Sequence, residues 1–338
     1  MNILQDIARR LQAVYPSGEA HAVARALLED GFQLTMTGIL LDKDRELSAE
    51  QRQRLEKCVR RLLDGEPVQY VTGRCFFLGR PFAVRPGCLI PRPETEDLVS
   101  AIVEHLKQHS HEDVSEPSFD RNRSLTVGTC LRHVETGESG SQEHTAENVS
   151  KTRPYSVSES RIKTNKFSPL RVLDIGTGSG CIAVSLALEL GDAARVEAWD
   201  ISPDALGIAR ENAKKLDSTV DFKLENALNP SDSSASFDLI VSNPPYVRQL
   251  EKADMQANVL DHEPALALFV PDDDPLLFYR AIGNYAFRHL TPGGTLWFES
   301  NRYLTNDTAD LLNRIGFAQV DIIVDRFGHP RHLKAIRP

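Results

Sequence analysis

The sequence predicts an α/β protein with a doubly wound parallel sheet, an antiparallel hairpin at the C-terminal edge of that sheet, and a small N-terminal helical domain. From residue 169 onward, short apolar runs alternate with helical stretches, which is the pattern of parallel strands joined by helices. The last two apolar runs follow one another too closely for a helical crossover, so they should pair antiparallel. Residues 3–63 instead carry apolar side chains at three- and four-residue spacing, which is typical of helices.

The N-terminal region is predicted to be a helical domain over residues 1–75. Ile7, Leu11 and Val14 recur at helical spacing, and Ser48 is a candidate N-cap for a further helix. At roughly 150 residues per domain, a chain of 338 residues has room for this domain beside the sheet. The stretch from Gly65 to Val99 is dense in Gly and Pro, and residues 76–107 are predicted to form a β-hairpin linker and a first helix that begins near Pro93.

Residues 108–168 predict a disordered or loosely ordered insertion. The segment is rich in Ser, Thr, Glu, His and Asn, poor in large apolar residues, and without a sustained period. No metal-ligand spacing recurs among the histidines in or beside it, so we expect no metal site there: His105, His109, His111, His133 and His144.

Residues 169–338 are predicted to form the sheet domain. One helix should span SPDALGIARENAKKL, between the second and third strands. The expected strands, in chain order, are RVLDI, VEAWD, FKLE, FDLIVS and GTLWFE, followed by the hairpin strands AQVDIIV and HLKAI.

Charge and cysteine content exclude several classes of protein. The formal net charge of -9 argues against stable binding to a long stretch of nucleic acid. The five scattered cysteines include no CxxC pair, which favours a reducing cytoplasm over a disulfide framework or a zinc ribbon. No uncharged run approaches the roughly 20 residues of a membrane span, so we expect no membrane association.

A glycine-rich turn follows the first strand of the sheet domain and predicts a cofactor site. The turn comprises Gly176, Thr177, Gly178, Ser179 and Gly180, and it opens the next helix, whose N-terminal amides favour electronegative groups. Asp200 ends the second strand, where a carboxylate can accept both hydroxyls of a ribose. Together they predict a cofactor that carries a nucleoside.

The spacing of the turn disfavours two other phosphate-bearing ligands. Dinucleotide sites use GxGxxG, whereas this turn is GxGxG with Cys181 at the third glycine position. No Lys-Ser/Thr pair follows, which disfavours a Walker-type phosphate cradle. A purely structural turn stays open as an alternative at this point.

Asn243, Pro244, Pro245 and Tyr246 follow the fourth strand, at the same edge of the sheet as the glycine turn. The prolines restrict the backbone so that the Pro244 carbonyl can point outward, beside the Asn243 amide oxygen and the Tyr246 ring. Two acceptors and an aromatic face suit a planar amide or amine nitrogen, so these residues are the candidate substrate and catalytic site. A simple proline turn is the structural alternative.

With these motifs in place, the chain resembles the class I S-adenosylmethionine-dependent methyltransferases and, within them, the HemK/PrmC family of protein N(5)-glutamine methyltransferases. The resemblance extends over nearly all of the chain except the insertion. It rests on GEPVQYVTG (65–73), LIPRPETE (89–96), DIGTGSG, DISPDAL, SNPPY, HEPAL (262–266) and DRFG (325–328).

The resemblance implies a Rossmann-like methyltransferase sheet, S-adenosylmethionine as cofactor, and class I peptide-chain release factors as protein partners. The acceptor would be the glutamine of their Gly-Gly-Gln loop. Close relatives of the family methylate a glutamine in a large-subunit ribosomal protein. Residues 1–75 would then recognise the substrate, and residues 169–338 would bind the cofactor and carry out catalysis.

By the same resemblance, cofactor contacts fall on Gly176 to Gly180, Asp200 and Asn243, with Asn226 and Ala227 near the adenine. Where the family has an aromatic residue after the third strand, Ala227 cannot stack on the base. Of the family's Glu-Ile-Gly-x-x-Gln stretch after the fifth strand, only the glutamate survives, as Glu299.

The predicted reaction is direct transfer of a methyl group to an amide nitrogen held by Asn243 and the Pro244 carbonyl, with Tyr246 facing the developing cation. An adenine-N6 or cytosine-N4 DNA methyltransferase uses the same residues but needs a flipped base and a basic channel. The motifs would also suit a ribosomal-protein glutamine methyltransferase or a non-catalytic binding protein. Redox chemistry is disfavoured, because no dinucleotide fingerprint or redox cysteine pair is present.

Overall fold

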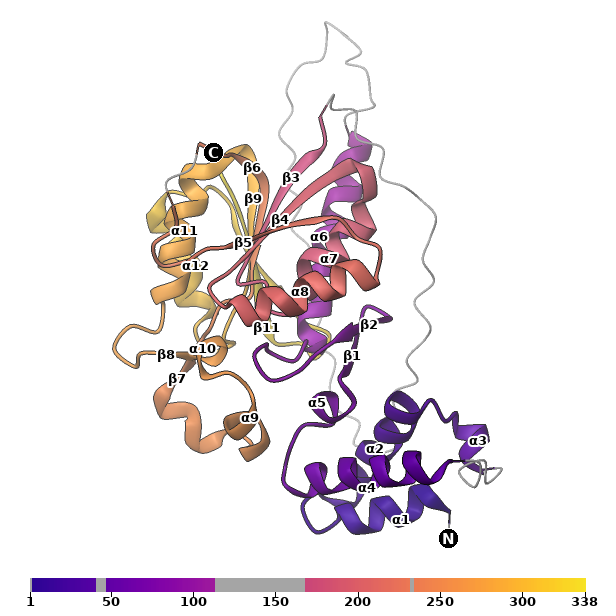
Figure 1. Ribbon diagram of the computed structural model, residues 1–338. Coiled ribbons are helices and arrows are strands. Elements are labelled where there is room, and N and C mark those ends of the chain that lie inside the picture. Colours follow the sequence, from indigo (N-terminus) through magenta and orange to yellow (C-terminus); the bar gives the residue numbers. More distant parts are fainter. Residues whose placement is uncertain (1, 41–46, 113–167, 232–233) are drawn as a thin grey trace, which may run out of the picture.

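The computed structural model describes residues 2–40, 47–112, 168–231 and 234–338. An N-terminal group of helices lies apart from a larger α/β body, and a hairpin of β1 (Arg74–Phe77) and β2 (Arg80–Ala83) lies between them (Figure 1). Among the described residues, no helix is long and apolar enough to cross a membrane. Cys58, Cys75, Cys88 and Cys181 are buried free thiols.

The α/β body is built on one seven-stranded sheet with the order β10-β11-β9-β6-β3-β4-β5. Five strands run parallel, and β11 pairs antiparallel with both β9 and β10, which confirms the predicted edge hairpin. The strands are β3 (Leu170–Ile175), β4 (Ala194–Asp200), β5 (Val220–Leu224), β6 (Phe237–Ser242), β9 (Leu290–Glu299), β10 (Val320–Val324) and β11 (Pro330–Ile336).

Helices cover both faces of the sheet, because successive side chains of a strand point to opposite faces. On β3, Val172 belongs to one buried apolar cluster and Leu173 to the other. The helices α6 (Pro93–Glu112), α7 (Cys181–Leu190) and α8 (Pro203–Lys215) pack on one face. The opposite face is covered by α11 (Leu277–His289) and α12 (Thr305–Ile315) (Figure 1).

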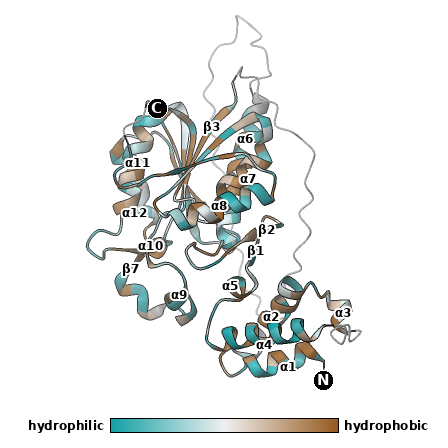
Figure 2. Ribbon diagram, viewed as in Figure 1, coloured by the Kyte–Doolittle hydropathy of each residue, from teal (hydrophilic) through white to brown (hydrophobic). Residues whose placement is uncertain are grey.

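The N-terminal helices have an apolar core of their own. They are α1 (Ile3–Leu11), α2 (Ser17–Ala26), a π-helical turn (Leu27–Gly31), α3 (Met36–Leu40), α4 (Ala49–Leu63) and α5 (Val68–Thr72). Ser48 caps α4 as predicted, since its hydroxyl accepts from the Gln51 backbone N–H and the Gln51 side chain accepts in return from that of Ser48. In Figure 2 the ribbon of α4 alternates between hydrophobic and hydrophilic residues, as expected for a helix with one buried face.

The predicted hairpin consists of β1 (Arg74–Phe77) and β2 (Arg80–Ala83), which pair antiparallel. Its two turn residues, Leu78 and Gly79, both have positive φ (48° and 72°), as a type I′ turn requires. The hairpin is attached to the sheet domain through Asn212 of α8, whose amide accepts from Ala83 N at 2.6 Å and donates to Ala83 O at 3.0 Å.

The helix α6 begins at Pro93, as predicted, but it continues to Glu112. Residues 108–112, which we predicted to belong to the loose insertion, are therefore helical, because extending a helix adds a backbone hydrogen bond for each residue ordered. Gln108 Nε2 also donates to Glu104 Oε1 one turn earlier, at 3.1 Å. The rest of the predicted insertion, residues 113–167, lies outside the described part of the chain.

Short elements occupy the connection between β6 and β9. They are β7 (Val247–Arg248), a 3₁₀ turn (Gln249–Asp254), α9 (Ala257–His262), α10 (Ala265–Leu268) and β8 (Phe269–Val270), with β7 and β8 paired in parallel. Glu263 joins this connection to the segment before α6: its carboxylate accepts from Ile90 N at 3.2 Å and forms a 2.5 Å ion pair with Arg92.

Candidate active site

The glycine turn leaves the carboxyl end of β3 and is fixed to the end of the neighbouring strand β4. Gly176, Gly178 and Gly180 all have positive φ, at 77°, 56° and 80°. The amide N–H groups of Gly176 and Thr177 donate to Trp199 O, and Gly178 N donates to Asp200 Oδ2 at 2.8 Å. The turn and the Asp200 carboxylate are therefore held as one unit.

Asp174, the last acidic residue before the turn, holds the turn in place through hydrogen bonds. Its side chain is fully buried and accepts from Thr177 Oγ1 at 2.6 Å and from Ala183 N at 3.2 Å. Burial raises the pKa of Asp174 to about 7. Its contacts stabilise the turn and the first turn of α7 from within the core.

One cavity of about 290 Å³ opens at the carboxyl edge of the sheet and contains most of the predicted site residues. Its polar lining includes Asp200, Glu225 and Ser202, and apolar side chains such as Phe278 and Ile282 form much of the remaining wall. The predicted residues that line it are Gly176, Gly178, Asp200, Asn226, Ala227, Asn243, Pro244 and Pro245.

Thr177, Ser179, Gly180 and Tyr246 do not line the cavity. Thr177 and Ser179 are buried. The Thr177 hydroxyl donates to Asp174, and the Ser179 carbonyl accepts from Asn212 Nδ2. Gly180 lies where a Cβ would meet the Ala209 Cβ of α8 at 3.0 Å, so its place in the motif has a packing reason. The predicted cofactor contacts of these turn residues stay predictions.

Asp200 is half-buried beside the cavity with both carboxylate oxygens engaged. Oδ1 accepts from Ser202 N at 2.9 Å, while Oδ2 accepts from Gly178 N. Burial raises the pKa of Asp200, against the opposing effect of these N–H donors. Each oxygen has a further lone pair, so the carboxylate can also accept from a ribose.

Asn226 and Ala227 follow β5 at the cavity wall. Asn226 Oδ1 accepts from Leu228 N at 3.0 Å, which orders the local turn, and Ala227 packs partly against the apolar cluster under α11. Glu225, which sequence reasoning did not single out, also lines the cavity; its carboxylate accepts from the Ser231 amide and hydroxyl.

Asn243 and Tyr246 converge on a buried carboxylate, that of Glu299 at the end of β9. Asn243 Nδ2 donates to Thr95 Oγ1 at 3.2 Å, and Thr95 Oγ1 donates to Glu299 Oε2 at 2.6 Å. The Tyr246 hydroxyl donates to Glu299 Oε1 at 3.2 Å. Glu299 has no exposed surface, and burial raises its pKa to about 7. Thr95 lies in the RPETE stretch, and the sequence predicted no role in the site for this residue beyond its place in that motif.

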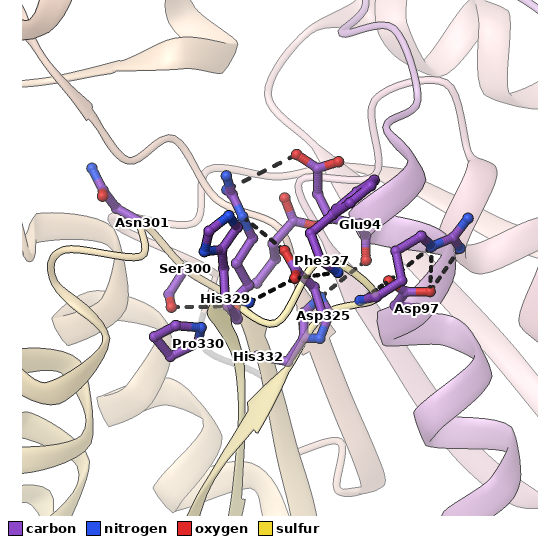
Figure 3. A network of polar contacts seen from close by, with 12 residues as sticks. Glu94, Asp97, Ser300, Asn301, Asp325, Phe327, His329, Pro330 and His332 are labelled. Atoms are coloured by element: carbon purple, nitrogen blue, oxygen red, sulfur yellow. Dashed lines mark hydrogen bonds and ion pairs between the residues drawn. The ribbon is translucent and has the colours of Figure 1, made fainter. Parts of the chain in front are cut away.

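The DRFG segment, between β10 and β11, forms a hydrogen-bonded turn next to this site. The buried Asp325 carboxylate accepts from the amides of Phe327 and His329, both at 2.9 Å, and pairs with Arg331. Figure 3 shows this turn beside Glu94 and Asp97, in the first turns of α6. Asp97 accepts from the Arg326 backbone and guanidinium, so the motif fastens the sheet edge to α6.

No group of side chains suited to hold a metal ion occurs in the described ranges. Of the histidines for which we expect no metal site, those between residues 113 and 167 lie outside the described part of the chain. His105, within α6, instead packs against Trp297, with ring centroids 5.5 Å apart.

The chain is similar to known proteins along its whole length. A family described as the PrmC N-terminal domain matches residues 2–73, and one described as a methyltransferase domain matches residues 166–320. Release factor glutamine methyltransferase of Bacteroides thetaiotaomicron is 39% identical, over 98% of this chain and 98% of that protein. Its counterpart in Flavobacterium psychrophilum is 35% identical, over 98% and 97%. Among solved structures, TrmN from Thermus thermophilus is 25% identical, with a TM-score of 0.36 over 50% of this chain and 45% of that one.

Proposed function

The chain belongs to the release factor glutamine methyltransferase family, and from this premise we propose that its acceptor is the glutamine of the Gly-Gly-Gln loop of class I release factors. It is an S-adenosylmethionine-dependent protein-glutamine methyltransferase. The names of its relatives support a release factor as partner, and the family resemblance of the motifs points to that loop.

The cavity suits the cofactor. A largely apolar wall that also includes the Asp200 and Glu225 carboxylates matches a ligand that combines an adenine ring with a ribose. In our proposal Asp200 accepts the ribose hydroxyls, the amides of the glycine turn approach the cofactor closely, and Asn226 and Ala227 border the adenine. When bound, S-adenosylmethionine supplies an electrophilic methyl group on a sulfonium.

Asn243, Pro244 and Tyr246 are the proposed catalytic residues, and together with Pro245 they bind the acceptor side chain. The nitrogen of an amide is a poor nucleophile, because its lone pair is delocalised into the carbonyl. Acceptors on the protein, Asn243 Oδ1 and the Pro244 carbonyl, hold the two N–H groups and stabilise the positive charge that grows on nitrogen. The Tyr246 ring adds a π face toward that charge.

The reaction needs no strong base. A nitrogen–carbon bond forms as the carbon–sulfur bond breaks, and the methylated nitrogen, now acidic, loses its proton to water. Accordingly, the side chains proposed to touch the amide are hydrogen-bond acceptors and an aromatic ring.

The observation that carries this proposal is that one cavity is lined both by the glycine turn with Asp200 and by Asn243 to Pro245. A methyl donor and an amide acceptor can therefore meet in a single site. The same proposal places the enzyme in the cytoplasm, in keeping with the buried, unpaired state of the four cysteines that the structure describes.

The test is incubation of the protein with methyl-labelled S-adenosylmethionine and four separate acceptors: a release factor, the same factor with its loop glutamine replaced by alanine, the ribosomal large subunit, and DNA. We expect label on the intact factor alone. Label only on the ribosomal subunit or only on DNA would overturn the proposed acceptor.

Two asparagine variants complete this test. Asn243→Ala should abolish labelling, because the amide loses an acceptor that is needed most as charge develops. Asn313→Ala removes an amide from the exposed face of α12 and should leave labelling unchanged.

A further inference from the structure

We propose that Thr95 and Glu299 form a positioning relay that turns the Asn243 amide so that its oxygen, rather than its NH₂ group, faces the acceptor. This inference rests on the proposed function, in which Asn243 Oδ1 holds the N–H of the target nitrogen. Neither Thr95 nor Glu299 is required to touch the substrate; both act through Asn243 and Tyr246.

The direction of each hydrogen bond follows from which groups can donate. An ionised carboxylate only accepts, so the single hydroxyl proton of Thr95 must go to Glu299 Oε2, 2.6 Å away. Thr95 Oγ1 is then left with lone pairs toward its other neighbour. Asn243, 3.2 Å away, can satisfy them only with its NH₂ group.

The amide of asparagine has two ends with opposite roles. With its NH₂ group committed to Thr95, its oxygen is set on the opposite side, and Asn243 lines the cavity. The flipped amide would aim N–H donors at the N–H groups of the acceptor. It would repel the positive charge that grows on nitrogen instead of stabilising it.

Glu299 directs both of its oxygens to residues of the site. Oε2 accepts from Thr95 and Oε1 from the Tyr246 hydroxyl, and the carboxylate has no ion-pair partner within 4.0 Å among the described residues. A fully buried carboxylate is costly without a partner cation. An apolar side chain would fill the same space without this cost. A buried carboxylate at this position is therefore explained by its hydrogen bonds, which hold the site residues in place.

The charged and titratable groups around Glu299 come from several elements. Burial is the largest influence and, together with Glu94 of α6, raises the pKa of the carboxyl to about 7, although the Thr95 hydroxyl, Arg331 of β11 and the Tyr246 hydroxyl lower it. The Tyr279 hydroxyl of α11 donates to the Glu299 carbonyl and not to its carboxylate. Protonation of Glu299 would allow its carboxyl to donate a hydrogen bond. The Thr95 hydroxyl would then no longer be required to donate to Glu299, and the orientation of the Asn243 amide would no longer be fixed.

The first test uses a matched set of threonine variants. Thr95→Val keeps the shape and removes the hydroxyl, and we expect kcat to fall at least about tenfold, the cost of one misdirected polar contact to a developing charge, with unchanged cofactor Kd and acceptor KM. Thr95→Ser restores the hydroxyl and should stay within about threefold of wild type. Thr308→Val makes the same change at a buried threonine of α12 and should leave kcat unchanged.

The second test replaces the carboxylate by an amide. In Glu299→Gln the side-chain amide can accept from only one hydroxyl and must donate to the other, so this variant should lower kcat at least as much as Thr95→Val. In wild type, kcat should rise with pH through about 7, as Glu299 ionises, and this rise should be absent in Glu299→Gln. Equal kcat for Thr95→Val and wild type, or equal losses for Thr95→Val and Thr95→Ser, would overturn the relay.

A third measurement separates the relay from the identity of the acceptor. Carbon-13 NMR titration of the glutamate carboxyls should give Glu299 a pKa near 7, and a higher pKa in Thr95→Val, which loses a donor to the carboxylate. An unchanged pKa in Thr95→Val would overturn the relay whether or not a release factor is methylated. The kinetic tests apply to whichever acceptor wild type labels, so a wrong acceptor is recognised separately.

Discussion

At the scale of single residues, the site is organised by three acidic side chains, each placed at the carboxyl end of a strand. Asp174 lies in β3, Asp200 at the end of β4 and Glu299 at the end of β9. All three accept hydrogen bonds from the segments that surround the cavity, and burial raises the pKa of all three. Strand ends converge at one edge of the sheet, so charges distant in sequence act on one pocket.

Asp200→Asn should weaken cofactor binding. The amide keeps one acceptor oxygen but loses the charge and one of the acceptors proposed for the ribose hydroxyls. A charge-assisted hydrogen bond contributes about 1.5–3 kcal/mol, so Kd should rise roughly tenfold to a hundredfold. Isothermal titration calorimetry measures the change. Asp221→Asn removes the same charge from an exposed part of β5 and serves as the control. If Asp200→Asn and the control bind the cofactor with the same Kd, Asp200 does not bind the ribose.

Asp174→Asn should change how stability depends on pH. The raised pKa means that between about pH 4 and pH 7 the native state binds more protons than the unfolded chain, so this group lowers the free energy of unfolding as pH rises. Asp174 contributes its full stabilisation to the free energy of unfolding only at a pH below the pKa that it has in the unfolded chain. Asparagine does not titrate, and its oxygen can accept from Thr177 and Ala183.

Urea unfolding at pH 5 and pH 8 tests this expectation. The free energy of unfolding of Asp174→Asn relative to wild type should increase from the lower to the higher pH by on the order of 2–3 kcal/mol, at about 1.4 kcal/mol per pKa unit. A difference that does not vary with pH would mean that Asp174 keeps an ordinary pKa in the native protein.

At the scale of elements, α7 and α8 approach each other closely at the end of the glycine turn. Gly180 is the N-cap of α7 and has φ of 80°; a Cβ there would lie 3.0 Å from Ala209 Cβ and 3.2 Å from Ala209 Cα. The backbone conformation and the approach of α8 both require a residue without a side chain.

Gly180→Ala should destabilise the protein by about 2–5 kcal/mol, from left-handed strain and from overpacking against α8. It should also weaken cofactor binding, because the turn would shift. Gly207→Ala is the control on α8, where a Cβ meets nothing within 4 Å, and it should stabilise by up to about 1 kcal/mol. Thermal unfolding measures both variants. If both alanines stabilise alike, the close packing of the two helices is not a constraint.

At the scale of the whole molecule, the N-terminal helices and the catalytic body have separate apolar cores. The N-terminal core runs from Leu4 to Val71, and the cavity is lined by residues from Gly87 onward. Between them Tyr70 donates to Cys88 O at 2.5 Å, close to the cavity wall. This arrangement suits a division in which one part binds the protein acceptor and the other performs the transfer.

Removal of residues 1–66 should abolish methylation of an intact release factor while cofactor binding persists. A lone glutamine side chain offers little binding energy, so remote contacts must hold it in the attack geometry. The truncation keeps Tyr70 and leaves both apolar clusters of the sheet intact. Calorimetry with the cofactor and a methylation assay give the two readouts. Full-rate methylation by the truncated enzyme would refute the recognition role of the helices.

Replacing residues 113–167 by a short Gly-Ser linker should leave folding and methyl transfer largely intact. The deleted stretch has few large apolar residues, so it has little to contribute to a core. Thermal unfolding and turnover of the deletion variant, compared with wild type, measure the outcome. A large loss of either would show that the segment belongs to the fold or to the active site.

The sequence by itself determined the features that depend on residues close together along the chain. Periodic apolar residues predicted the strands and helices, Gly and Pro marked the hairpin and the start of α6, and the glycine turn, Asp200 and Asn243 to Tyr246 predicted the two halves of the site. Hydrogen-bonding capacity, backbone restriction and side-chain period belong to neighbouring residues, so a linear pattern records them. The helical extension to Glu112 escaped this reasoning, because composition changes there before the helix ends.

Only the tertiary structure decided which side chains of the site act on one another. Thr95 and Glu299 are 204 positions apart, and Thr95 and Asn243 are 148 apart, yet they share consecutive hydrogen bonds. The parallel order of β3, β6 and β9 brings Asn243 beside Glu299, and the packing of α6 brings Thr95 to both. Contacts of this kind depend on strand order and helix packing, which are properties of the folded chain and not of any segment of it.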